Sequence, residues 1–366
     1  MIDRRIVSNF NWLYFIAILI VSVIGVITIY SANHARPEEF FRGLYIKQIY
    51  WIIYGLIAML FALALDYRWF SRYAYLIYTL TLIGLGYVLV NGVVASGSKR
   101  WIYIGSISIQ VSEFAKVAIV IALAKYFESG KISGQYTLRD LIIPAMLTAT
   151  LGGFIVVQPD LGTTMMILFI FLAFIMAIEI NRMTLIKLFV GGVALAPALW
   201  FFLKDYQKAR LRTLFNPELD PLGAGYHSIQ SKIAIGSGGF WGKGLFAGTQ
   251  SRLNFLPEKH TDFIFSVFAE ETGFIGVILL ITLFTYIILK GLNIAFRAAD
   301  RFGFFLSLGL IVSISFYMIF NIGMTIGIFP ITGIPLPFVS YGGSSLITNF
   351  FAVGLLLNVE MRRTLH

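Results

Sequence analysis

The segment 255–265 holds the residues whose types and spacing best fit chemistry. It reads Phe-Leu-Pro-Glu-Lys-His-Thr-Asp-Phe-Ile-Phe, so a polar loop runs directly into an apolar stretch. The pattern predicts Thr261 as the N-cap of a helix and Asp262 in its first turn, where a carboxylate complements the positive helix end. We expect the chemistry at this segment, at the boundary between membrane and water. The pattern alone leaves a second interpretation open, in which Thr261 and Asp262 only cap the helix.

Charged residues also occur in or beside other apolar segments. Glu113 and Lys116 are three positions apart, and therefore share one helical face. Each charge alone would cost about 2.5–3.5 kcal/mol at the centre of a membrane helix, so the spacing predicts a pair that faces other helices. Such a pair can be a structural strut or part of the site. Asp160 follows Pro159, which we expect to set the first helical turn, and Asp160 can be a cap or a site residue.

The loop 204–261 is basic. Its cations are Lys204, Lys208, Arg210, Arg212, Lys232, Lys243, Arg252 and Lys259, against the acids Asp205, Glu218, Asp220 and Glu258. A basic surface beside an exposed carboxylate suits an anionic lipid head group, and Arg or Lys can hold a pyrophosphate without a metal ion. The chain has no cysteine, no D-x-D or HEXXH motif and scattered histidines, so no cofactor is required, although a divalent cation would be compatible.

The composition indicates a polytopic membrane protein. Of 366 residues, 58% are hydrophobic and 13% are charged. Ten apolar segments are close in length to the ~20 residues that a bilayer requires. They are 12–30, 49–65, 75–94, 111–127, 141–157, 161–180, 185–203, 263–289, 304–324 and 340–357. We therefore expect an all-α fold, a single integral membrane domain over 1–366, with a large extracytoplasmic loop at about 204–261 between helices 7 and 8. Basic residues are too dispersed to favour a nucleic-acid partner.

Basic residues in the short connections predict the orientation. A cytoplasmic N-terminus places most of them inside. These are Arg4, Arg5, Arg68, Arg72, Lys131, Arg139, Arg182, Lys187, Lys290, Arg297, Arg301, Arg362 and Arg363. The short outer loops then contain only Arg36, Arg42, Lys47, Lys99 and Arg100. Both termini are thus predicted to be cytoplasmic, and Asp262 to face outward. The first apolar segment is too long for a signal-peptide core and is expected to be retained.

Three shorter patterns complete the outer face. Ile229 and Ile233 are four positions apart and predict a short helix on the membrane surface. The glycines between 236 and 248 could admit a phosphate to backbone N–H groups, but flexibility is the commoner reason for such a run. The apolar segment 327–337 contains several helix breakers, so we expect a partly re-entrant segment that closes the outer face. Ser266, Ala269 and Gly273 follow Asp262 at helical spacing and predict close packing.

Three segments resemble the SEDS family, the shape, elongation, division and sporulation proteins. They are 158–163 (Gln-Pro-Asp-Leu-Gly-Thr), 255–265, and 335–344 (Pro-Leu-Pro-Phe-Val-Ser-Tyr-Gly-Gly-Ser). The resemblance extends over essentially the whole chain, including the ten helices. Residues 248–251 (Gly-Thr-Gln-Ser) resemble the rod-shape members more than the division members.

The resemblance implies a peptidoglycan glycosyltransferase of the bacterial cytoplasmic membrane, for cell elongation and rod shape. It would polymerise lipid II into glycan strands at the outer face, release undecaprenyl pyrophosphate, and work with a class B penicillin-binding protein. The resemblance implies Asp262 as the catalytic base and a functional role for Glu113 and Lys116. One carboxylate is sufficient, because a pyrophosphate leaves readily once cations neutralise it. The residues expected to contact the substrate are Arg100, Glu113, Lys116, Asp160, Arg210, Arg212, Lys243 and Ser344.

Two other functions remain open at this point. A flippase for lipid-linked precursors could use Glu113, Lys116 and Glu270 along a hydrophilic path. Against it, the polar residues that the sequence places lie in the outer half of the bundle. A scaffold that activates a transpeptidase would tolerate changes at Asp262.

Overall fold

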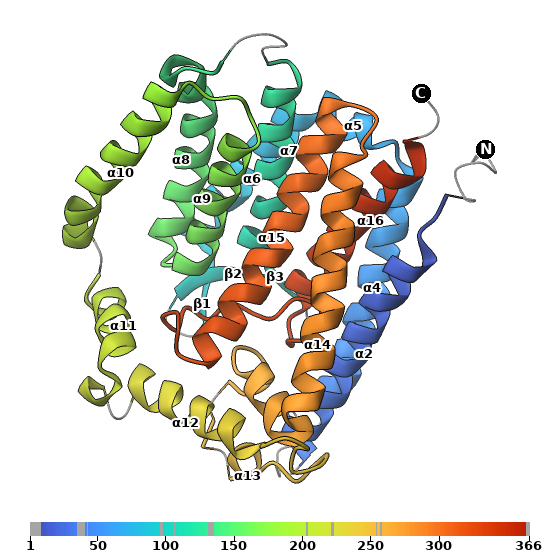
Figure 1. Cartoon of the computed structure of the whole chain (residues 1–366), viewed down its shortest axis with the longest axis vertical. Coiled ribbons are helices and arrows are strands. Elements are labelled where there is room, and N and C mark those ends of the chain that lie inside the picture. The colour runs from blue at the N-terminus through green and yellow to red at the C-terminus, as the bar shows by residue number, and fades with distance from the viewer. Residues whose placement is uncertain are drawn as a thin grey trace.

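The computed structural model describes residues 9–34, 41, 43–95, 98–105, 107–130, 135–202, 204–220, 223–253, 255–256 and 258–363. The loop residues Arg4, Arg5, Arg36, Arg42 and Lys131 lie outside these ranges. The long helices are α2 (Trp12–His34), α4 (Leu44–Ala64), α6 (Ala74–Asn91), α7 (Val111–Glu128), α8 (Ile142–Val157), α9 (Leu161–Met176), α10 (Arg182–Phe202), α14 (Ile264–Phe296), α15 (Arg301–Thr325) and α16 (Gly343–Arg362) (Figure 1). Every predicted apolar segment overlaps one of them.

Several of these helices have the length and composition of membrane spans. Within the described residues, seven are long and apolar enough to cross a membrane, counting the 3₁₀ turn η1 (Leu138–Leu141) with α8, and α9 is apolar but shorter. The helix α7 is excluded by its own composition, because its 18 residues include four charged ones. The predicted all-α membrane fold is therefore confirmed, while ten crossings stay a prediction.

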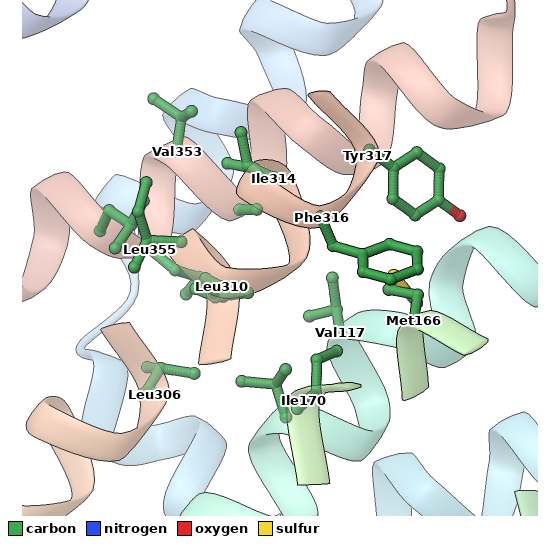
Figure 2. Close-up of a cluster of buried hydrophobic side chains, with 14 of the residues drawn as sticks. Val117, Met166, Ile170, Leu306, Leu310, Ile314, Phe316, Tyr317, Val353 and Leu355 are labelled. Atoms are coloured by element: carbon green, nitrogen blue, oxygen red, sulfur yellow. The ribbon is translucent and has the colours of Figure 1, made fainter. Parts of the chain in front are cut away.

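The helix α15 lies at the centre of the bundle (Figure 1). It packs against α7, α9, α14 and α16, and most of its residues are buried. A helix that is apolar on all sides is stable only where other elements surround it. Figure 2 shows the result: Leu306, Leu310 and Ile314 of α15 meet Val117 of α7 and Ile170 of α9.

A small antiparallel sheet lies between α6 and α7 in the chain. Its strands are β1 (Val93–Ala95), β2 (Ser98–Ile104) and β3 (Ile107–Gln110), in the order β1-β2-β3. The sequence interpretation missed this sheet and wrongly extended the third span to residue 94. The helix ends at Asn91, because Gly92 leads into extended backbone. Aromatic and β-branched residues on both sides of Gly105, which has a positive φ, were the available signal.

The long loop 204–261 contains four short helical elements. They are α11 (Asp205–Phe215), η2 (Pro217–Leu219), α12 (Ala224–Ser237) and α13 (Thr249–Arg252). The predicted short helix around Ile229 and Ile233 is α12, and its position on the membrane surface stays a prediction. In Figure 1, α12 and α13 lie at the opposite end of the bundle from α5 (Tyr67–Arg72) and the end of α16.

The glycine run of this loop packs against a break in α14. Gly273 interrupts that helix with φ 65° and ψ −164°. The N–H groups of Lys243 and Gly244 donate to the carbonyl oxygens of Glu270 and Glu271, each at 3.0 Å. A Cβ at Gly242 would lie 2.1 Å from the Glu271 oxygen. Gly242 therefore allows two backbones to touch, a role that neither sequence interpretation, flexibility or a phosphate cradle, included. Ser266, Ala269 and Gly273 are buried, as predicted.

The start of α14 differs from the prediction. Phe263 is the N-cap, without a side-chain cap bond, so Asp262 precedes the helix and Thr261 does not cap it. A tight turn replaces the expected cap, because the N–H groups of Thr261 and Phe263 both donate to the carbonyl of Glu258, at 3.1 and 3.3 Å. The Thr261 hydroxyl donates to the same residue.

Candidate active site

Asp262 lies in a turn that is fastened to α15 and to the segment 327–337. The side-chain amide of Asn321 in α15 donates to the backbone oxygens of Asp262, at 3.0 Å, and of Ile334, at 2.7 Å. Gly333 faces the carboxylate, since a Cβ built there would lie 3.3 Å from Asp262 Oδ2. The segment 327–337 is irregular, as predicted, and forms one side of the Asp262 environment.

Two further hydrogen bonds fix the turn to the start of the last helix. The N–H of Tyr341 donates to the His260 carbonyl at 2.8 Å. The Ser340 hydroxyl donates to the Thr261 carbonyl at 2.6 Å. The motifs at 255–265 and 335–344, far apart in sequence, therefore meet at one place.

The Asp262 carboxyl is partly buried and its acidity is set by its neighbours. Burial raises the pKa of Asp262 to about 6, and the negative charge of Glu258 acts in the same direction. The positive charges of Arg210 and Arg100 and a hydrogen bond with Thr261 oppose that rise in pKa. A carboxyl group with a pKa of about 6 is mostly ionised at neutral pH, yet basic enough to accept a proton in a reaction.

Arg100 of β2 connects Asp262 to a second carboxylate. Its Nη1 lies 3.6 Å from Asp160 Oδ2. Asp160 is the N-cap of α9 and accepts the N–H of Thr163 at 3.1 Å, so the cap and the ion pair coexist. Pro159 precedes this cap, so the prediction that it sets the first helical turn is wrong. Arg100 thus lies within electrostatic reach of both Asp160 and Asp262.

Glu113 and Lys116 form the predicted buried pair. Their side chains lie 2.8 Å apart and are 4% and 2% exposed. Lys116 Nζ also donates to Asn349 Oδ1 of α16 at 3.0 Å and lies 4.6 Å from the centre of the Tyr317 ring. The ring supplies a cation–π contact, so the ammonium group has three complementary partners, Glu113, Asn349 and Tyr317.

Tyr317 joins this pair to the Asp160 group. Its hydroxyl points away from the aliphatic cluster (Figure 2), donates to Glu113 Oε1 at 3.4 Å and lies 3.5 Å from Thr163 Oγ1. The Thr163 hydroxyl donates to Asp160 Oδ2 at 3.0 Å. A continuous polar connection therefore runs from Lys116 through the bundle to Asp160.

The remaining predicted contacts fall in different places. Ser344 accepts the N–H of Gln110 at 3.1 Å and so ties α16 to β3 beside this polar connection. Arg210 and Arg212 lie on α11, and Arg212 is exposed. Lys243 lies elsewhere: its Nζ is 2.7 Å from Glu270 Oε1 and donates to Thr249 Oγ1 at 2.8 Å. Lys243 therefore neutralises a buried carboxylate of α14.

The sequence interpretation missed three polar residues that organise the site: Tyr317, Asn321 and Asn349. A signal existed, because Tyr317 and Asn321 are four positions apart in an apolar span and polar residues inside membrane helices need partners. Within the described residues, no three His, Asp or Glu side chains gather to hold a metal ion.

A family model described as a cell cycle protein, for FtsW, RodA and SpoVE, matches residues 11–365. The chain belongs to this family. The resemblance to SEDS proteins is thereby confirmed. Peptidoglycan glycosyltransferase MrdB of Escherichia coli K12 is 39% identical to this chain, over 88% of it and 86% of the relative. Peptidoglycan glycosyltransferase RodA of Treponema pallidum is 33% identical, over 98% and 99%. Stage V sporulation protein E of Bacillus subtilis is 39% identical, over 93% and 94%.

Solved structures of the family share the fold. One, described as structural coordination of polymerization and crosslinking by a peptidoglycan synthase complex, has a TM-score of 0.83 and 32% identity, over 98% of this chain and 99% of that one. RodA of Thermus thermophilus has a TM-score of 0.72 and 27% identity, over 97% and 98%. The fold expected from the sequence is thus the fold of the family.

Proposed function

We propose that this chain is a peptidoglycan glycosyltransferase that polymerises lipid II into glycan strands for cell elongation and rod shape. Family membership and the names of the relatives support the reaction class. The observation that carries the mechanism is the environment of Asp262: a partly buried carboxyl with a pKa of about 6, beside Arg100 and Arg210.

Asp262 acts as the general base. It takes the proton of the acceptor sugar hydroxyl as that oxygen attacks the anomeric carbon of the donor. The new glycosidic C–O bond forms, the bond to the pyrophosphate oxygen breaks, and undecaprenyl pyrophosphate leaves. A general base typically contributes 10²–10⁴-fold. Arg100 and Arg210 neutralise the departing charge in place of a metal ion, since guanidinium groups bind phosphate oxygens in pairs of hydrogen bonds.

We propose that Asp262 and the loop 204–261 face the outside and that both termini are cytoplasmic. The distribution of basic residues in short connections supports this orientation. So does the placement of α12 and α13 at the end of the bundle opposite to α5 (Figure 1). Because the chain has no cysteine, single exposed sites can be labelled. Ser237→Cys is expected to react with a membrane-impermeant thiol reagent in intact cells and Ser129→Cys is not. The reverse pattern would overturn the orientation.

The partner we propose is a class B penicillin-binding protein that cross-links the strands. The similar solved structure from a complex of polymerisation and cross-linking supports it. The decisive experiment incubates the purified chain with lipid II, alone and with this partner, and separates the products on a gel. Glycan strands are expected with the partner. Failure to make strands, together with transport of lipid II across vesicles, would favour the flippase instead.

A further inference from the structure

We propose that Asn321 is a positioning residue for Asp262, a role that rests on the function proposed above. Asn321 lies on α15, is fully buried, and does not contact the carboxylate itself. It acts through the backbone that carries Asp262.

One amide group fastens two irregular segments at once. Asn321 Nδ2 has two hydrogens, and its two acceptors are the carbonyls of Asp262 and Ile334. Both carbonyls belong to backbone outside the helices, which must find partners from side chains when it is buried. The facing carbonyls also fix which way the amide points, because only its nitrogen can donate to both.

The two fastened segments form the environment of the base. Ile334 follows Gly333, which faces Asp262 Oδ2. Movement of either segment therefore changes the distance between the carboxylate and its surroundings. A displacement of about 1 Å at a catalytic group can lower the rate by about 10²-fold.

Asn321 belongs to a largely buried helix that also makes polar contacts with its neighbours. Tyr317 is one helical turn earlier on the same face and its hydroxyl meets Glu113 and Thr163. Asn321 therefore connects the backbone of Asp262 to α15, the helix that also contributes Tyr317 to the buried polar connection.

The test replaces the amide by an apolar group of similar size, Asn321→Leu, in the full chain with its partner. Initial polymerisation rates are measured over a range of lipid II concentrations. We expect kcat to fall by about 10²-fold with little change in KM, because the base is displaced while substrate contacts remain. Ser313→Ala is the matched control: Ser313 is buried on the same helix and bonds only to the Leu310 carbonyl within it. Its kcat is expected to stay near that of the wild type.

A double variant separates positioning from a general structural effect. If Asn321 acts through Asp262, then Asp262→Asn with Asn321→Leu is no slower than Asp262→Asn alone. An additive loss of kcat in the double variant, or a wild-type kcat in Asn321→Leu, overturns the positioning role of Asn321. Neither result contradicts the role of Asp262 as the general base. Near wild-type activity of Asp262→Asn would instead overturn the proposed function.

If Asn321→Leu does not fold, Asn321→Asp takes its place. It has the same shape but cannot donate two hydrogens, so the same loss of kcat is expected and the same outcomes contradict it.

Discussion

The two ends of α7 carry two ion pairs with the same spacing and the same length, but different surroundings. Glu113–Lys116 and Lys125–Glu128 are both three positions apart and both 2.8 Å long. The first pair is 4% and 2% exposed, whereas each side chain of the second is 33% exposed. The two pairs therefore differ in their access to water and not in the distance between their charged atoms. A pair inside the bundle has no solvent to replace a lost partner.

The largest effect is expected from breaking the buried pair. Glu113→Ala or Lys116→Ala strands the other charge and should lower the free energy of unfolding by about 3–5 kcal/mol. The double change should cost less than the sum of the two, since no uncompensated charge remains. Thermal melting of the purified chain measures the loss of stability, and the polymerisation assay measures the accompanying loss of activity. Additive losses would show that the two side chains do not depend on each other.

The other end of the same helix provides the control. Lys125→Ala and Glu128→Ala should each cost about 0–1 kcal/mol, because water can solvate the remaining charge. If these variants lost as much free energy of unfolding as Glu113→Ala, burial would not determine the contribution of an ion pair to stability.

A third ion pair, Lys243–Glu270, has intermediate access to water. Glu270 is fully buried, but its partner Lys243 is 25% exposed. After Lys243→Met, Glu270 Oε1 still accepts from the Thr249 hydroxyl at 3.0 Å and from the N–H of Gln250 at 3.1 Å. We expect a loss of about 1–3 kcal/mol, the penalty for a buried polar group that loses one partner. A loss equal to that of Lys116→Ala in the same melting experiment would contradict this ranking.

The same dependence on surroundings predicts a small shift in the pH profile. Because the folded-state pKa of Asp262 is raised to about 6, activity should fall as pH drops through that value and the base becomes protonated. Glu258 raises this pKa and Arg210 lowers it. Glu258→Gln should therefore move the acid limb of kcat/KM to lower pH, and Arg210→Gln should move it to higher pH. Shifts in the opposite directions would show that these charges do not act on Asp262.

Much of the fold was predictable because it depends on composition and periodicity. Apolar segments of sufficient length identified the helices, and the spacing of Glu113 and Lys116 identified their pairing before any contact was known. The pattern could not show that Lys125 and Glu128, with identical spacing, lie near water. Burial depends on which helices surround a residue, and a local pattern does not contain that information.

The site was predictable only in part, for a related reason. The motif around Asp262 predicted a carboxylate near basic side chains, which the structure has. It predicted the wrong local structure, because a turn held by Glu258 replaced the expected cap. Lys243 looked like one cation of a basic loop, while its partner Glu270 lies 27 positions further along the chain. Asn321 supplies the hydrogen bonds for two segments distant in sequence. Such contacts follow from the assembled bundle and not from the neighbours of any one residue.

The most direct measurement of the central claim compares two neighbouring carboxylates in one assay. Asp262→Asn keeps the shape of the side chain but cannot take a proton, whereas Glu258→Gln changes an exposed carboxylate four positions earlier. Both variants are purified with the partner, checked for folding, and given lipid II. Glycan polymerisation is expected to fall by at least about 10²-fold in Asp262→Asn and to stay near the wild-type rate in Glu258→Gln at neutral pH. A folded, partner-bound Asp262→Asn protein that polymerises lipid II at nearly the wild-type rate would contradict the role of Asp262 as the general base.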